Sequence, residues 1–131
     1  MEYPVITLCG STKFKDEFVR VNRELTLQGY IIISVACYGH AGDDFDDSQK
    51  EMLDDIHKRK IDTADGIFVI NVDNYIGKST QSEIDYAKEH GKFVKYLIDP
   101  VTLRQNIWFT KNLTERFYLL RWDMNVKTVY I

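Results

Sequence analysis

A carboxylate and several hydroxyl groups lie close together in the segment IGKSTQSEIDYA, residues 76–87. Its carboxylate, Glu83, could act as a nucleophile or stabilise a developing positive charge. However, Thr80 and Glu83 also have the spacing of a capping box, in which the glutamate only satisfies backbone N–H groups. The local sequence leaves both roles open.

The hydroxyl groups of Ser79, Thr80 and Ser82 are expected at the N-terminus of a helix. Helix N-termini bind anions through free N–H groups and the helix dipole, so a 5′-phosphate could bind here. Hydroxyl residues are also common as simple helix caps. The same position would favour the ionised form of Glu83 near neutral pH.

Asp65 is a second candidate catalytic residue, because a leaving group departs more readily when it receives a proton or a hydrogen bond. Such assistance is typically worth ~10²–10⁴ in rate. Asp65 also stands in Ala64-Asp65-Gly66, a sequence that suits a turn between a helix and a strand. A catalytic or base-binding role and a turn role therefore both stay open.

No metal or cofactor is expected from sequence motifs. The three histidines, at 40, 57 and 90, are dispersed and lack zinc-site spacing. The aspartates of the segment 43–47 lack the ligand spacing of an EF-hand. Residues 10–12, Gly-Ser-Thr, form neither a dinucleotide fingerprint nor a P-loop.

Short apolar segments alternate with amphipathic patterns along the chain. The former predict strands, and the latter predict helices from about Phe14 to Gly29, from Ser48 to Thr63 and from Thr80 to about His90, where Gly91 would end the helix. The expected strands are VITLC at 5–9, YIIISVAC at 30–37, GIFVIN at 66–71, KFVKYLI at 92–98 and TVYI at 128–131. YIIISVAC is expected to be buried on both faces. We therefore predict an α/β fold of the Rossmann or flavodoxin type: a doubly wound, mainly parallel sheet of about five strands with helices on both faces.

Ligands of open α/β sheets bind in the crevice at the carboxyl ends of the strands. The polar segment 38–47 is typical of a binding loop at that edge. The candidate substrate-binding residues, all expected at this edge or in the loops beside it, are Cys9, Gly10, Ser11, Thr12, Lys13, Asp73, Gly77, Ser79 and Thr80.

The 131 residues are expected to form a single domain, 1–131. A net charge of −3 without an isolated basic cluster argues against a nucleic-acid polymer as partner. No apolar run approaches the roughly 20 residues that span a bilayer, so no membrane partner is expected. The N-terminus lacks signal-peptide features, which predicts a cytoplasmic protein. Cys9 and Cys37 are accordingly expected to be reduced and unpaired.

Three motifs together resemble the nucleoside 2-deoxyribosyltransferase superfamily, which includes deoxynucleoside monophosphate N-glycosidases. They are LCGST at 8–12, KIDTADGIFVIN at 60–71 and STQSEIDYAKEHGKFVKYL at 79–97. The resemblance implies that Glu83 is the nucleophile, that Asp65 lies near the base, and that residues 10–12 shape the sugar or phosphate end of the pocket. Lys13 would add a charge there. It also implies a nucleoside or nucleotide as small-molecule partner and a homodimer or larger homo-oligomer.

The sequence departs from this family at two positions near the expected nucleophile. Ser79 and Asp85 stand where the family commonly has glycine. Asp85 would either add bulk and charge near the pocket floor or point away on the helix. These departures motivate an alternative from another class, a non-catalytic nucleotide-binding or sensing module that retains the fold.

Overall fold

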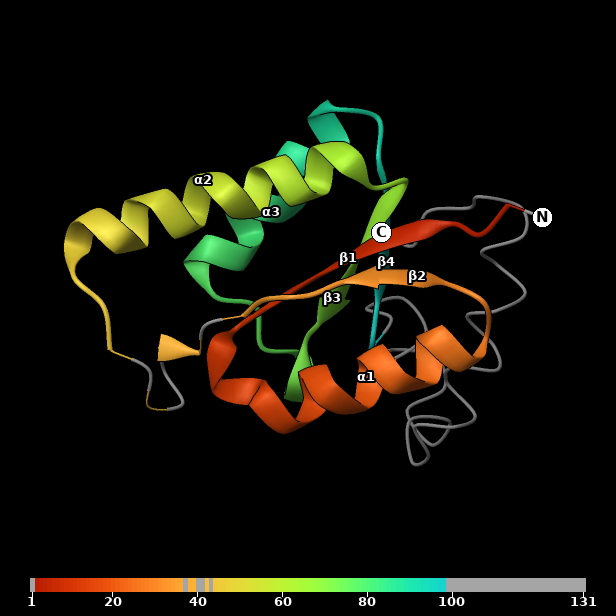
Figure 1. Cartoon of the computed structure of the whole chain (residues 1–131), viewed down its shortest axis with the longest axis horizontal. Helices are drawn as coiled ribbons and strands as arrows, with labels where there is room; N and C mark the ends of the chain where they lie inside the picture. Colours follow the sequence, from red (N-terminus) through yellow and green to blue (C-terminus); the bar gives the residue numbers. More distant parts are fainter. Residues whose placement is uncertain (1, 37, 40–41, 43, 99–131) are drawn as a thin grey trace.

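The computed structural model describes residues 2–36, 38–39, 42 and 44–98, which form a parallel four-stranded sheet and three α-helices (Figure 1). The strands are β1 (Val5–Gly10), β2 (Ile31–Ile33), β3 (Gly66–Ile70) and β4 (Phe93–Tyr96). The helices are α1 (Lys15–Leu27), α2 (Asp47–Thr63) and α3 (Lys78–Glu89), with short 3₁₀ turns η1 (Thr12–Phe14) and η3 (Val72–Asn74). The predicted α/β class is confirmed. The expected strand at 128–131 lies outside the described residues.

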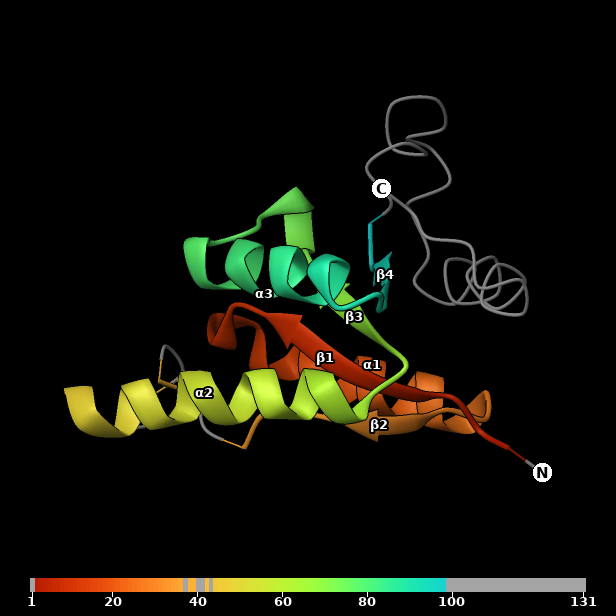
Figure 2. The same ribbon diagram turned by 90° about the horizontal axis from the view of Figure 1, so that it is seen from above.

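Helices cover both faces of the sheet. Figure 1 shows α1 on one face and α2 and α3 on the other, and Figure 2 shows α2 and α3 side by side over the sheet. Alternate residues of a strand point to opposite faces, so the strands supply two separate cores. On the α1 side Phe18, Val21 and Leu25 pack with Ile6, Leu8, Phe68 and Ile70. On the other side Ile61, Ile84 and Ala87 pack with Cys9, Ile67, Val69 and Val94. None of the described helices has the length and apolar character needed to cross a membrane.

The strand order is β2-β1-β3-β4, so the chain moves to one side of β1 first and then returns to the other. This reversal falls between β1 and β3, where an open α/β sheet leaves a crevice for a ligand. Gly10 pairs with Ile70, which places the carboxyl ends of β1 and β3 at the same level. Residues that follow these two strands are therefore brought together.

The prediction for residues 30–37 is wrong in length and in burial. Only Ile31–Ile33 form a strand, and the side of β2 away from β1 has no partner strand among the described residues. Ile31 is half exposed, with 50% of its surface accessible. An apolar, β-branched run predicts strand structure, but it does not distinguish a central strand from an edge strand.

The capping box considered for Thr80 and Glu83 is not present. Helix α3 begins at Lys78 after Gly77, which makes no side-chain cap, and Thr80 is already a buried helical residue. Glu83 thus lies in the second turn, beyond the free N–H groups of the helix start. At the other end the predicted C-terminal glycine is confirmed, because Gly91 has a φ of +70° and its N–H bonds to the carbonyl of Lys88.

Gly66 offers a test of the packing between β3 and β4. A Cβ at this position would lie 2.3 Å from the ring of Phe93, which pairs with Gly66 across the two strands. We expect Gly66→Ala to lower the free energy of unfolding by about 1–3 kcal/mol, the usual cost of overpacking a core. Urea denaturation measures this difference. Glu51→Ala on the exposed side of α2 is the control, and an equal effect of the two substitutions would contradict the packing argument.

Candidate active site

A cleft of about 590 Å³ opens at the carboxyl ends of β1 and β3. This volume lies in the range typical of small-molecule sites. Seven residues singled out from the sequence line it: Gly10, Ser11, Thr12, Gly77, Ser79, Thr80 and Glu83. The loop before α2 and the first turns of that helix complete the wall with Gly39, Asp44, Phe45, Lys50 and Asp54, and Tyr75 and Lys78 precede or begin α3.

Glu83 lies where three elements meet beside this cleft. Its side chain is 17% exposed, and one carboxylate oxygen, Oε2, is 3.7 Å from Nε2 of His57 on α2. The same Nε2 is 3.3 Å from Sγ of Cys9, which is fully buried on β1. Glu83 therefore combines a solvent-facing edge with a dry, polar back wall.

The pKa of Glu83 is raised from its ordinary value of 4.5 to about 7, chiefly by burial and also by the negative charge of Asp54. A hydrogen bond from Cys9 and the charge of Lys58 act in the opposite direction. The expectation that the helix N-terminus would keep Glu83 ionised near neutral pH is therefore wrong. The carboxyl is buried in the second turn, so loss of hydration outweighs the helix dipole, which is confined to the first turn.

The two neighbours of Glu83 are neutral near pH 7. Burial lowers the pKa of His57 to about 4, and the charge of Lys60 lowers it as well. Burial raises the pKa of the Cys9 thiol, and the nearby Glu83 carboxylate raises it too. Cys9 is thus a protonated thiol rather than a nucleophile. The expectation of an unpaired cysteine is confirmed for Cys9, whereas Cys37 lies outside the described residues.

The remaining cleft residues supply positive charge, hydroxyl groups and aromatic rings. Lys50 and Lys78 bring positive charge, and the hydroxyl residues at 11, 12, 79 and 80 bring hydrogen-bonding groups. Phe45 and Tyr75 bring aromatic rings, which favour contact with flat, apolar groups. Three residues of the predicted binding loop at 38–47 line the cleft, namely Gly39, Asp44 and Phe45.

Asp65 does not lie in the cleft. It precedes β3, at the opposite end of the strand from Ile70, and its Oδ2 accepts a hydrogen bond of 2.8 Å from the N–H of Val5. The structure therefore places Asp65 in the turn role and not beside Glu83.

Three further sequence candidates also lie outside the cleft wall. Asp73 is exposed in a left-handed turn, with φ of +53°, and does not line the cleft. Cys9 lies behind Glu83 and has no surface on the cleft. Lys13 does not line the cleft either, but its Nζ lies 3.6 Å from the ring centroid of Tyr75, which does.

Sequence reasoning missed His57 and Asp54. Lys50, Asp54 and His57 have i, i+4, i+7 spacing, so they share one face of α2, and the buried Ile61 continues it. The sequence signal was the position of Asp54 and His57 on the same helical face as the apolar residue Ile61. That signal shows that His57 faces inward, but not which residues of β1 and α3 it meets.

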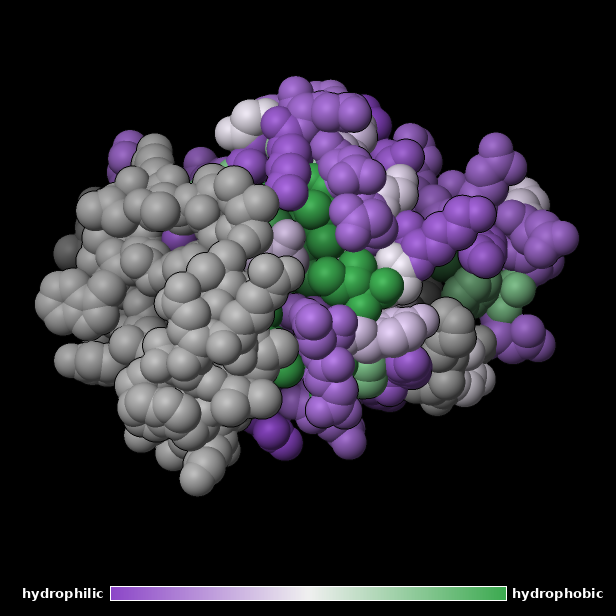
Figure 3. Space-filling model, turned by 180° about the vertical axis from the view of Figure 1, so that it is seen from behind, coloured by the Kyte–Doolittle hydropathy of each residue, from purple (hydrophilic) through white to green (hydrophobic). Residues whose placement is uncertain are grey.

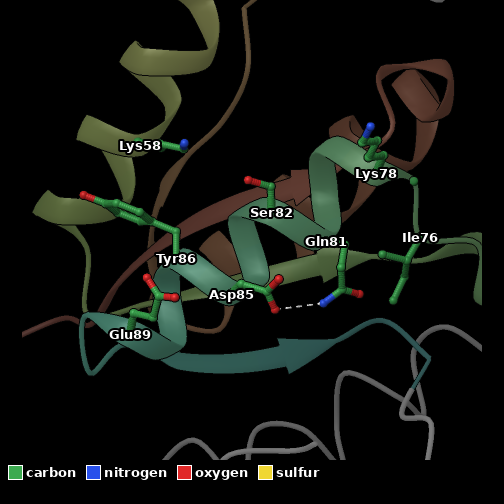
Figure 4. Close-up of a pocket in the computed structure, with 9 residues that line it drawn as sticks. Lys58, Ile76, Lys78, Gln81, Ser82, Asp85, Tyr86 and Glu89 are labelled. Atoms are coloured by element: carbon green, nitrogen blue, oxygen red, sulfur yellow. Dashed lines mark hydrogen bonds between the residues drawn. The ribbon is translucent and has the colours of Figure 1, made fainter.

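A second hollow runs along the outer side of α3 and does not include Glu83 (Figure 4). Its lining residues include Lys58, Gln81, Ser82 and Asp85. Asp85 accepts a hydrogen bond of 3.1 Å from Nε2 of Gln81. Of the two positions considered for Asp85, the structure shows the outward one, so this residue does not obstruct the cleft.

Taken together, the chain is an α/β protein with a partly buried glutamate beside a ligand-sized cleft. Comparisons with family models, with curated proteins and with solved structures find no match to this chain. The resemblance to the nucleoside 2-deoxyribosyltransferase superfamily stays a prediction, and the functional argument depends on the site itself.

Proposed function

We propose that this protein cleaves or transfers the N-glycosidic bond of a nucleoside or nucleoside 5′-monophosphate, with Glu83 as nucleophile. The observation that carries the proposal is the position of Glu83, which lies on the wall of the cleft while its carboxylate is largely removed from water. A poorly hydrated carboxylate is well suited to stabilise positive charge on a sugar ring, because electrostatic interactions are strong in a water-excluded site.

The proposed reaction has two steps. The ionised oxygen of Glu83 bonds to C1′ while the bond from C1′ to the base nitrogen breaks, and its electron pair leaves with the base. Water, or the nitrogen of a second base, then attacks C1′ and releases the carboxylate. The Cys9 thiol donates a hydrogen bond to Glu83 and helps to hold its orientation.

Asp54 is the second carboxylate that this reaction requires. It lines the cleft from α2, and its charge acts on Glu83. In the proposed cycle the departing base nitrogen takes its proton from solvent, and the Asp54 carboxylate accepts a proton from the water that attacks C1′ and returns it to solvent. Asp65, first considered as the second catalytic residue, has no part in this cycle.

Asp54→Asn should therefore slow base release by about 10²-fold or more. It should also lower the pKa of Glu83, because the like charge that raises this pKa is lost. The acidic limb of the pH–rate profile would then move to lower pH. Asp55→Asn is the matched control, since Asp55 is exposed and pairs with Arg59 at 3.8 Å. A slower rate with an unmoved acidic limb would contradict the placement of Asp54 beside Glu83.

The charge of the cleft favours the 5′-monophosphate over the free nucleoside. Lys50 and Lys78 suit a phosphate, and Ser79 and Thr80 lie in the first turn of α3, where helix N–H groups attract anions. The ring of Phe45 or Tyr75 would then face the base. A neutral 5′-hydroxyl would leave the lysines without an ionic partner from the ligand.

The proposal is tested by incubating the purified protein with a panel of nucleosides and nucleoside 5′-monophosphates. Free base is measured by chromatography, beside Glu83→Ala. Release by the wild type and not by the variant supports the enzyme. The alternative, a nucleotide-binding or sensing module, predicts binding by calorimetry without release of base. The observation behind this alternative is Ser79, which lines the cleft at a position where the resembled family commonly has glycine.

We also propose the finer arrangement of a doubly wound, Rossmann-like sheet and a homo-oligomeric assembly. The strand order and the helices on both faces support the first. For the second, Figure 3 shows hydrophobic side chains at the surface in the middle of one face, where another surface could pack. Light scattering during size-exclusion chromatography measures the assembly, and a monomer at micromolar concentration would contradict it.

A further inference from the structure

Three metal-binding side chains from distant parts of the sequence converge behind the cleft. The Sγ of Cys9, a ring nitrogen of His57 and a carboxylate oxygen of Glu83 all lie within 4.8 Å of one another. They come from β1, α2 and α3, so each is fixed by a different element of the core. Zinc is bound in proteins by these three ligand types, and their number matches the three protein ligands typical of a catalytic zinc site.

The contacts do not match a Cys-His-Glu nucleophilic triad. In a triad the acid binds one ring nitrogen of the histidine and orients the other toward the nucleophile. Here Cys9 and Glu83 both approach the same atom, Nε2 of His57, at 3.3 and 3.7 Å. Three donor atoms of the kinds that bind metal ions are thus gathered around one imidazole nitrogen, within 4.8 Å of one another.

Two of the three separations lie close to those of a tetrahedral ion, and the third, from Cys9 to Glu83, is within 4.8 Å. Zinc bonds of about 2.3 Å to sulfur and about 2.0–2.1 Å to nitrogen and oxygen set the S···N separation at about 3.6 Å and the N···O separation at about 3.3 Å. The corresponding separations are 3.3 Å from Cys9 to His57 and 3.7 Å from His57 to Glu83. Shifts of a few tenths of an ångström would bring both to the ideal values.

We propose that Cys9, His57 and Glu83 form a zinc-binding site whose fourth coordination position faces the cleft. Glu83 is the ligand that borders the cleft, so an exogenous ligand reaches the ion from that side. On binding, a bond forms between the metal and the sulfur of Cys9, and the thiol proton passes to the buffer. The combination of thiolate, imidazole and carboxylate favours Zn²⁺ over Mg²⁺ or Ca²⁺, which prefer oxygen ligands.

Zinc at this site would inhibit the proposed glycosidase. A carboxylate oxygen bonded to the ion cannot also attack C1′. This consequence rests on the proposed function, whereas the binding site itself does not.

Binding is measured on the 131-residue chain without substrate, by competition for Zn²⁺ with a chromogenic chelator and by the cobalt–thiolate absorption band after addition of Co²⁺. We expect one equivalent of zinc and a thiolate band in the wild type. Cys9→Ser should remove the band and His57→Gln should weaken zinc binding by more than the 10–100-fold typical of outer ligand partners. Cys37→Ser is the matched control for the other cysteine, and it should retain the band.

Glu83→Gln is a second variant, in which the shape of the side chain is almost unchanged. It should also weaken zinc binding, and it provides the test if Cys9→Ser does not fold. Absence of stoichiometric zinc binding in the wild type, or a cobalt band that persists in folded Cys9→Ser, would overturn the proposal. Zinc binding by the wild type, with no base release from any substrate when the zinc has been removed by a chelator, would refute the glycosidase alone. Base release without zinc binding would refute the metal site alone.

Discussion

Glu83→Gln should lower kcat/KM for base release by on the order of 10³-fold or more, the scale of loss seen when a covalent nucleophile is removed. Glutamine keeps the size of the side chain and can still accept a hydrogen bond from Cys9, but it carries no negative charge to stabilise the sugar cation. Substrate binding should change much less than the rate, because the lysines and hydroxyl groups of the cleft remain. Steady-state kinetics of base release and calorimetric titration with a nucleoside 5′-monophosphate measure the two effects separately.

The pH dependence of the wild type gives this prediction a second readout. Glu83 attacks only in its ionised form, and its pKa is about 7. The rate should therefore fall about tenfold for each pH unit well below 7 and level off above it. Glu89→Gln, an exposed position on the same helix, is the control and should keep both rate and profile. Retention of substantial activity by Glu83→Gln would exclude the nucleophile role.

Strand and helix periodicity predicted most of the fold. GIFVIN gave β3 to within one residue, and all five residues of this strand are buried. The pattern at 48–63 likewise placed α2 to within one residue at its start, where Asp46 and Gln49 form a true capping box. These predictions succeeded because the burial pattern of a strand and the cap of a helix both depend on residues close together in the sequence.

The start of α3 was mispredicted because its real cap carries no side-chain signal. Gly77 begins the helix without a capping side chain, and Thr80, which matches a cap by sequence, is buried in the first turn. The error mattered for chemistry. Helix α3 starts two residues earlier than predicted, at Lys78 and not at Thr80. Glu83 therefore lies in a buried second turn, where its charge is disfavoured, and not at the helix start, where its charge would be favoured.

The candidate site was only half visible in the sequence. The loop after β1 and the segment around Glu83 were found, because ligand crevices of parallel sheets occur at the carboxyl ends of strands. His57 and Asp54 were not found, since their relation to Glu83 depends on how α2 lies across the sheet beside α3. Asp65 was overestimated for the same reason: a turn at the amino end of a strand and a loop at its carboxyl end are equally polar in sequence.

Glu83→Gln should also make the folded protein more stable at pH 8, by up to about 3 kcal/mol, which is the energy equivalent of the raised pKa. The pKa of Glu83 is about 7 when folded and 4.5 in its ordinary environment, so the folded protein holds this proton more tightly than the unfolded chain. The wild type therefore loses stability as the pH rises from about 4.5 to 7, and above that range it bears the full cost of a buried charge. Glutamine has no charge to bury.

The stability difference between Glu83→Gln and wild type should thus be smallest near pH 4.5, grow up to pH 7 and stay constant above it. Urea denaturation at a series of pH values measures it, with Glu89→Gln as a control that should show no such growth. His57 contributes an opposite trend, losing stability as the pH falls from 6.5 toward its pKa of about 4, but this contribution is present in both proteins and largely cancels. A difference that does not change with pH would show that Glu83 is hydrated in the folded protein, and the argument for a reactive, desolvated carboxylate would then fail. If Glu83→Gln is inactive and yet more stable than the wild type, the charge that the reaction needs lowers the free energy of unfolding.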